Sequence, residues 1–445
     1  MDASSQHARV EVTQVRSHRR RDVARAFAWL AGFSATALLV VPKGFSVFAA
    51  LMLASTFVAL PDAWHSRREP MPRVFLGLLW TALAVLGVAA CSTWVSGADL
   101  STLDNPSRSL LLPWCAWLAW VTRVRMSCLW SGALVGLLLA FIMSIAQVGW
   151  GAARVGAGTN PIVFANAVLV LLVIVVFCRP ARITSAVRLL LVLAVSMAVA
   201  VVALSGSRGV LPGMGLILLV LLVGGKPPHR WRRLGLVALV SVALLAVLWT
   251  VPWLSSRFRL DQVHADVAGY AKGQVDQPIS ARLGLLDVAW SGFREAPIVG
   301  VGIGGFSARV DASRYCRDAP RHFCDLEHAH NDVAQWGATM GLPGVIALLA
   351  LYLVPLAIAR RQVRRSAPDV TRGPGWAAGM LVMMYVLSGL TQSMFSHALT
   401  TSMYLVLVGW LLGAATVERT RARRAAIRLS PNLPPDGDRS PRSGR

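Results

Sequence analysis

Charged side chains are scarce in this sequence. Asp, Glu, Lys and Arg make up 15% of the 445 residues, whereas 55% of the residues are hydrophobic and the mean hydropathy is +0.57. A soluble fold has no means of hiding that much apolar surface, but a lipid bilayer accepts it as solvent. The composition therefore excludes an ordinary soluble domain and indicates an integral membrane protein.

Acidic residues are scarcer than basic ones. The chain has 21 Asp and Glu against 44 Lys and Arg, which gives a formal net charge of +23. Such an excess could indicate nucleic-acid binding, but here the basic residues fall in short clusters between apolar segments. This distribution is typical of membrane interfaces, so nucleic acid is excluded as a partner and membrane lipids are expected to surround the chain.

Alternating apolar and polar runs, internal repeats and a separate soluble domain are also missing. The apolar runs are continuous, which argues against membrane β-strands and predicts an all-α, polytopic fold. About twelve windows approach the roughly 20 residues that span about 30 Å of hydrocarbon. We place them at 23–42, 44–60, 74–94, 108–122, 127–149, 162–178, 184–204, 209–224, 233–252, 333–358, 374–391 and 399–416.

No small-residue cleavage site follows the basic N-terminus, so we expect an uncleaved first helix. Lys and Arg concentrate in alternate connections, and the positive-inside rule then places both termini in the cytoplasm. The predicted organisation is a cytoplasmic basic tail at 1–22, transmembrane helices 1–9 at 23–252, a long outer loop at 253–331, transmembrane helices 10–12 at 332–416, and a cytoplasmic, disordered tail at 417–445.

Cysteine is infrequent, with six residues in the chain. Four of them lie in or near apolar windows, where a buried thiol behaves as a small hydrophobe. Cys316 and Cys324 are the only pair in the long outer loop. Their spacing suits a disulfide in an oxidising compartment, and two free thiols are the alternative.

Two arginines on the outer side require an explanation. Arg208, next to Ser207 in the short turn from Ser205 to Gly209, sits at membrane depth, where a guanidinium is costly without an anion. Arg282 opens a segment predicted to be an amphipathic helix on the outer membrane surface, and it could clamp a phosphate. The alternatives are snorkelling to lipid phosphates for Arg208 and a solvated helix face for Arg282. The apolar positions of the predicted helix are Leu285, Leu286, Ala289 and Trp290.

A glycine-rich run at 300–306 superficially resembles a dinucleotide-binding loop. It lacks the βαβ context that such a loop needs, so we expect no nucleotide cofactor. Glycines at this density predict instead a tightly turned backbone that allows close approach of chain and substrate.

Histidine is present where the outer loop re-enters the membrane, in the segment from Glu327 to Asp332. His330, followed by Asn331, suits acceptance of a proton near neutral pH, whereas His328 would point away if the segment were helical. The sequence has no HExxH motif and no cysteine cluster, so no metal site is expected. Two interfacial imidazoles without a catalytic role are the alternative. Weaker candidates are Arg154, near Asn160-Pro161, and His397.

These motifs, in this order, resemble the O-antigen ligase and polymerase superfamily of bacterial inner-membrane proteins. The likeness rests on the small-residue turn with Arg208, the segment from Ser280-Ala281-Arg282 through Trp290 and Pro297 to the glycine run, and His330-Asn331 at loop re-entry. It covers about 205–345 in motif and most of the chain in its pattern of spans.

The resemblance implies transfer of a glycan from undecaprenyl diphosphate to an acceptor hydroxyl on the periplasmic side. It implies that Arg208 and Arg282, with Arg154, bind the diphosphate, and that His330 is the general base, with His328, Asn331 and Ser207 in support. For a ligase the acceptor is lipid A–core oligosaccharide, without nucleotide or metal. Direct displacement would invert the anomeric centre.

Two other functions stay open at this point. A polymerase of O-antigen or exopolysaccharide differs from a ligase only in its acceptor. The absence of a second long outer loop and of a large C-terminal periplasmic domain favours the ligase. A membrane transporter would also accommodate twelve spans and intramembrane charges. Matching halves and midplane polar residues are missing, however, and the polar residues gather at the outer edge.

Overall fold

A computed structural model describes residues 3–65, 72–223, 235, 263–275, 277–316, 322–364 and 372–429. Its described residues contain helices and no strands, which confirms the predicted all-α membrane fold. Six of the described helices are long and apolar enough to cross a membrane. The main helices are α1 (Ala3–Ala37), α2 (Gly44–His65), α3 (Arg73–Ser96), α5 (Leu111–Thr122), α6 (Ser127–Gly149), α7 (Pro161–Phe177), α8 (Ser185–Ser205), α9 (Leu211–Val223), α12 (Val263–Ala271), α13 (Pro278–Glu295), α14 (Gly305–Asp311), α15 (Asp332–Val363), α16 (Pro374–Gly389) and α17 (Ala398–Leu429).

Every predicted span except the one at 233–252 coincides with a described helix. That window, apart from Gly235, lies outside the described residues, as does the tail from 430 onward. Two helices are longer than predicted. The first begins at Ala3, within the expected basic tail, and α17 continues past 416 to Leu429, because neither stretch contains a Gly or Pro that would end the helix. The helical part of each expected tail is therefore a continuation of a span.

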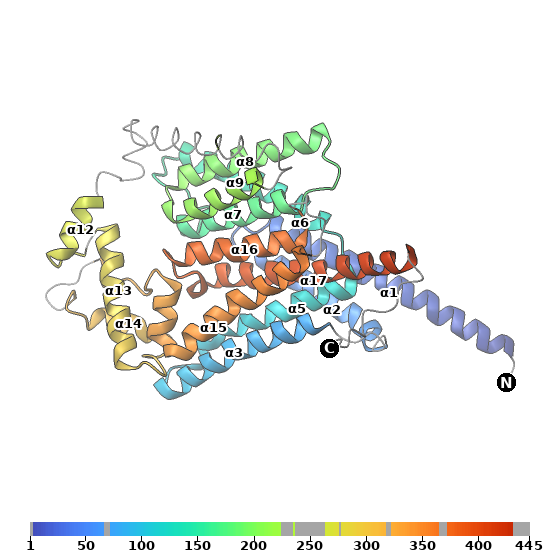
Figure 1. The fold of residues 1–445 in the computed structure, drawn as a ribbon, viewed down its shortest axis with the longest axis horizontal. Coiled ribbons are helices and arrows are strands. Elements are labelled where there is room, and N and C mark those ends of the chain that lie inside the picture. Colours follow the sequence, from blue (N-terminus) through green and yellow to red (C-terminus); the bar gives the residue numbers. More distant parts are fainter. Residues whose placement is uncertain are drawn as a thin grey trace, which may run out of the picture.

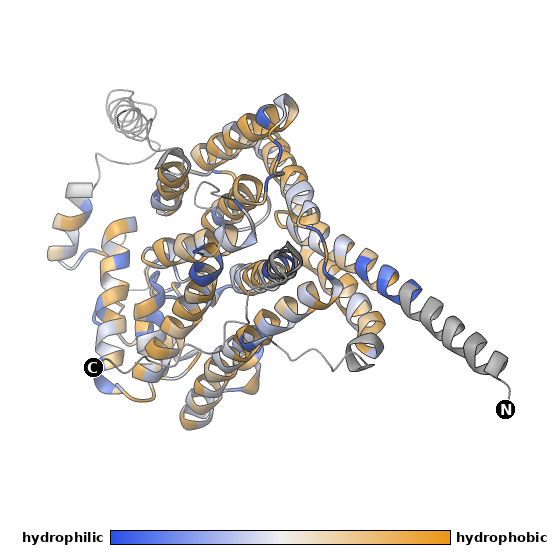
Figure 2. Ribbon diagram, turned by 45° about the vertical axis from the view of Figure 1, so that its right-hand side comes forward, coloured by the Kyte–Doolittle hydropathy of each residue, from blue (hydrophilic) through white to orange (hydrophobic). Residues whose placement is uncertain are grey.

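Helix α17 lies at the centre of the bundle, where it packs against α5, α15 and α16 (Figure 1). In its apolar window, 89% of the residues are buried. A Cβ at Gly409 or Gly413 would overlap the carbonyl oxygens of Leu112 and Ala116 in α5. This spacing of small residues lets two helix backbones approach closely, which is the usual basis of helix association in lipid. The helices of the bundle are hydrophobic along most of their length (Figure 2).

Helix α15 is broken near its N-terminal end, and the break attaches the glycine run to the bundle. Gly341 has non-helical angles (φ 64°, ψ −158°), and Pro343 has no N–H to donate. The carbonyls of Ala338 and Thr339 thereby lose their helical donors. The amides of Val301 and Gly302 replace them, at 2.8 and 3.1 Å.

The glycine run makes this replacement possible. Gly300 has φ 71°, and a Cβ there would overlap the backbone of Thr339 and Met340. A Cβ at Gly302 would overlap the side chain of Ser96 at the end of α3. The tight turn expected from the glycines is therefore present, and its close approach is to two membrane helices.

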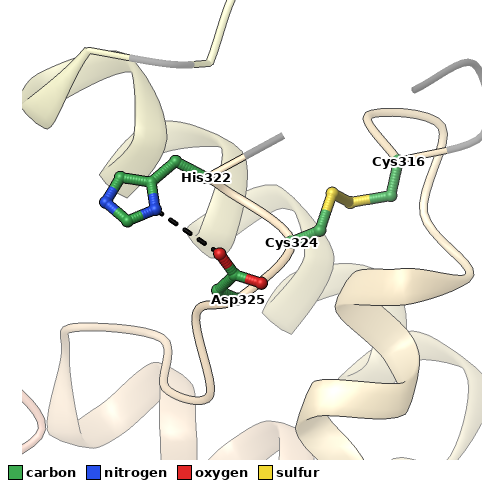
Figure 3. The surroundings of a disulfide bond; sticks show 4 residues. All are labelled: Cys316, His322, Cys324 and Asp325. Carbon is green, nitrogen blue, oxygen red and sulfur yellow. Dashed lines mark hydrogen bonds and ion pairs between the residues drawn. A yellow bond between two sulfur atoms is a disulfide. The ribbon is translucent and has the colours of Figure 1, made fainter. Parts of the chain in front are cut away.

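Helices α12, α13 and α14 lie together at one end of the bundle, and the N-terminal end of α1 lies at the opposite end (Figure 1). The loop helices share a small core, in which Leu285 and Ala289 of α13 are buried with Phe306, Val310 and Phe323. A disulfide joins Cys316 to Cys324, with Cα atoms 6.0 Å apart, next to His322 and Asp325 (Figure 3). The apolar residues predicted for α13 do not all share one environment. Leu285 and Ala289 are buried, whereas Trp290 is 58% exposed, so the helix has apolar residues on two sides.

The contact between the glycine run and α15 gives a prediction about stability. Gly300→Ala combines an unfavourable φ with backbone overlap, and it should destabilise the protein by about 2 kcal/mol or more. Gly305→Ala is the matched control, because a Cβ there meets only Val301 at 3.8 Å and should cost less than about 0.5 kcal/mol. Thermal unfolding in detergent, followed by size-exclusion chromatography, measures both variants. Equal melting temperatures for the two would contradict the attachment.

Candidate functional site

The segment that enters α15 is irregular from Leu326 to Asn331. Asn331 caps the helix: its side-chain oxygen accepts the N–H of Ala334 at 3.0 Å, and its amide donates to the carbonyl of Leu390 at 3.0 Å. Ala329 is fully buried in the core of the outer loop. The cap and the buried alanine hold His330 between them, so Asn331 positions this segment through its side-chain bonds to backbone groups.

His330 has a backbone φ of 50°, in the left-handed region that few non-glycine residues occupy. Its Nδ1 lies 2.8 Å from Oε1 of Gln392, a buried residue in the connection between α16 and α17. An amide oxygen accepts hydrogen bonds and does not donate them, so Nδ1 of His330 carries the proton. The other ring nitrogen, Nε2, is then the basic one.

Gln392 continues the chain of contacts to a second histidine. Its Nε2 lies 3.1 Å from Nε2 of His397 and, as an amide N–H, donates to it. The ring of His397 in turn meets the ring of His328 edge-on, with centroids 5.0 Å apart. The prediction that His328 points away assumed a helical segment, and that assumption is wrong because the backbone there is irregular.

Burial lowers the pKa of His330 below its ordinary value of 6.5. The hydrogen bond that His330 donates to Gln392 opposes this shift, while the positive charge of Arg282 and the nearby ring of His328 lower the pKa further. Burial, with His328 and His330, lowers the pKa of His397 to about 4. Both imidazoles are therefore neutral at neutral pH, and His330 is available to accept a proton.

Arg282 lies in the first turn of α13, which begins with a capping box between Gln277 and Ser280 and with Pro278 at its first position. Its side chain is half-buried. Burial lowers the pKa of Arg282, and the positive charge of Arg154 lowers it further. A guanidinium in this position, near a second one, is stabilised by a bound anion.

The turn that carries Arg208 lies beside Arg154. Arg154 donates from Nε to the carbonyl of Ser205 at 2.8 Å and from its guanidinium to Oγ of Ser207 at 3.4 Å. Ser207 donates to the carbonyl of Pro161 at 3.1 Å, which joins the turn to α7. Arg154, the weaker candidate from the sequence, therefore lies beside the turn that carries Arg208, a stronger candidate.

The same turn contacts the segment that contains Gln392. A Cβ at Gly209 would lie 2.6 Å from Oγ1 of Thr391, the residue before Gln392. The neighbour of Gly209 in the chain, Arg208, is partly buried. The structure thus brings the Arg208 turn, Arg154, Arg282 and His330 to one region, at the end of the bundle where α13 lies.

A cavity of about 420 Å³ lies beside His328. Apolar side chains such as Val85, Trp336 and Phe395 line most of it, and Asn105 lies in its wall. The side-chain oxygen of Asn105 is buried and has no hydrogen-bond partner among the described residues. A bound molecule with a donor group would satisfy this oxygen.

Gln392 is the residue that sequence reasoning missed. It stands in a short polar connection, Thr391-Gln392-Ser393, between two apolar helices, and that break in hydropathy is the signal that could have indicated it. In the described part of the chain, no three His, Cys, Asp or Glu side chains come together as possible metal ligands.

Comparison with known proteins gives one family. A sequence model for the family described as O-antigen ligase matches residues 193–349. The match runs from α8 through the Arg208 turn, Arg282 and His330 into α15. A search of curated proteins found no match.

The hydrogen bond from His330 to Gln392 gives a prediction about the pKa of the histidine. Gln392→Glu should raise the pKa of His330, because a carboxylate beside the ring stabilises the imidazolium. The pH dependence of diethyl pyrocarbonate modification at His330, followed by mass spectrometry, measures the shift. Modification of exposed His322 serves as the internal control and should follow the same curve in both proteins. An unchanged curve for His330 would contradict the contact.

Proposed function

We propose that this chain, whose residues 193–349 match the O-antigen ligase family, transfers an O-antigen glycan from undecaprenyl diphosphate to lipid A–core oligosaccharide. Such an enzyme is itself a multi-pass membrane protein and acts on a lipid-linked substrate. In this proposal the reaction takes place on the periplasmic face of the inner membrane, and both termini are cytoplasmic. The observation that carries it is the convergence of three arginines and a neutral histidine at one end of the bundle.

The arginines suit the leaving group of this reaction. Bond cleavage at the anomeric carbon places negative charge on the diphosphate, and fixed guanidinium groups stabilise that charge. Arg282 and Arg154 lie close enough for each charge to act on the other, and a diphosphate between them and Arg208 would relieve their repulsion. The planar guanidinium also matches two phosphate oxygens at once.

His330 suits the acceptor. Its Nε2 is the basic nitrogen when Nδ1–H donates a hydrogen bond to Gln392. The lowered pKa of His330 keeps the ring neutral near pH 7. In the proposed reaction Nε2 takes the proton of the acceptor hydroxyl as that oxygen attacks the anomeric carbon. Displacement of the diphosphate from the opposite side inverts the configuration, with no metal ion or nucleotide taking part.

The proposed diphosphate ligands are tested in cells that lack the gene. Wild-type protein should restore lipopolysaccharide with O-antigen on a gel, and Arg208→Ala and Arg282→Ala should not. Arg→Lys at either position should rescue poorly, because a point charge does not replace the planar fork. Arg182→Ala is the matched control: Arg182 is exposed and precedes α8, at the end far from Ser205.

The deletion strain also decides between the ligase and the polymerase. Loss of a ligase leaves O-antigen unattached on its lipid carrier, whereas loss of a polymerase leaves core capped by one repeat unit. The second pattern would overturn the proposed acceptor. Full activity of well-expressed Arg208→Ala would remove that side chain from the mechanism.

The proposed base is tested with purified protein, lipid-linked glycan and rough lipopolysaccharide in EDTA. His330→Ala should keep donor binding and lose transfer by roughly 10²–10⁴-fold, the usual contribution of a general base. His328→Ala should stay within a few-fold of wild type, since its described contact is ring packing on His397. Near-normal rates for His330→Ala, or complete inhibition by EDTA, would contradict a metal-free base mechanism.

A further inference from the structure

The outer loop contains a second cavity, separate in its lining from the site just described. It has a volume of about 680 Å³ and lies between α13 and the end of α14. Its size falls within the range of small-ligand sites. Asp287 and Trp290 of α13 line it on a different face from Leu285 and Ala289, which are buried in the loop core, and Val288 contributes to both.

Four of the five charged groups that line this groove form two ion pairs, and Arg294 adds one positive charge. Arg314 donates to Asp287 at 2.9 Å, and Arg309 is ion-paired with Glu295. The hydroxyl of Tyr315 also donates to Asp287, at 3.0 Å. Paired carboxylates and guanidinium groups offer acceptors and donors in fixed directions without a strong net field. This arrangement suits a ligand rich in hydroxyl groups better than it suits an anion.

Two further features favour such a ligand. Trp290 lines the groove and is 58% exposed, so one ring face is available to the apolar C–H face of a sugar. The hydroxyl of Ser313, also in the lining, is buried with no hydrogen-bond partner among the described residues. A ligand hydroxyl would satisfy it.

We propose that this groove binds the saccharide chain of a substrate while the arginine site holds the diphosphate. The inference rests on the proposed function for its choice of substrate. Helix α13 connects the two sites: Trp290 follows Arg282 by eight residues, which is about 12 Å along a helix axis. A donor whose diphosphate binds at Arg282 therefore has its sugars within reach of the groove. The acceptor oligosaccharide has the same chemistry, and the experiment separates the two sources.

The test measures binding of free saccharides, independently of transfer. The probes are the glycan released by mild acid from the cells' own lipid carrier and the core oligosaccharide released from rough lipopolysaccharide. Each is titrated into full-length protein in detergent. Trp290→Ala should bind its saccharide roughly tenfold more weakly than wild type. Trp94→Ala is the matched control, because Trp94 in α3 is 87% exposed and lies outside the groove.

The outcomes decide the groove separately from the reaction. Weaker binding in Trp290→Ala alone, with an unchanged melting temperature, supports the proposal, and the probe that shows it identifies donor or acceptor. Failure of wild type to bind either probe, or equal binding by Trp290→Ala, overturns it. Arg282→Ala should keep wild-type affinity for the free glycan, which has no phosphate. If wild type binds glycan in the groove but transfers none, the proposed function is wrong, while the assignment of the groove as a saccharide site still holds.

Discussion

The attachment of the loop helices to the bundle depends on the backbone carbonyls of Ala338 and Thr339 in α15. A break at Gly341 removes their helical donors, and unpaired carbonyls at the edge of a membrane helix are costly. The outer loop supplies the missing donors from Val301 and Gly302. Because this pairing fixes the loop against α15, it also fixes α13 relative to the histidine segment that enters the same helix.

This attachment explains the electrostatics of the site. Three arginines from separate parts of the chain gather near His330, and the charge of Arg282 helps to lower the pKa of that histidine. Gln392, an uncharged partner, orients the ring without stabilising the imidazolium as strongly as a carboxylate would. The site is therefore a cationic surface with a neutral imidazole beside it, an arrangement that favours binding of an anion.

Helix α13 connects three parts of the outer loop through its different faces. Its inner face packs Leu285 and Ala289 into the loop core, its first turn presents Arg282, and its remaining side contributes Asp287 and Trp290 to the groove. A single rigid helix can thereby hold a cationic site and a groove of paired charges at a constant separation. The disulfide between Cys316 and Cys324 constrains the chain that closes the same loop.

The sequence by itself predicted the apolar helices that the structure describes and the helix that carries Arg282. These follow from local properties, because a segment in lipid must satisfy its own backbone as a helix and polar residues must gather at its ends. Only the tertiary structure decided that Gln392 bonds His330, that His328 meets His397, and that Arg154 lies beside the Arg208 turn. Those pairs are brought together by helix packing, which depends on small residues such as Gly409 and Gly413 and leaves no local periodic signal.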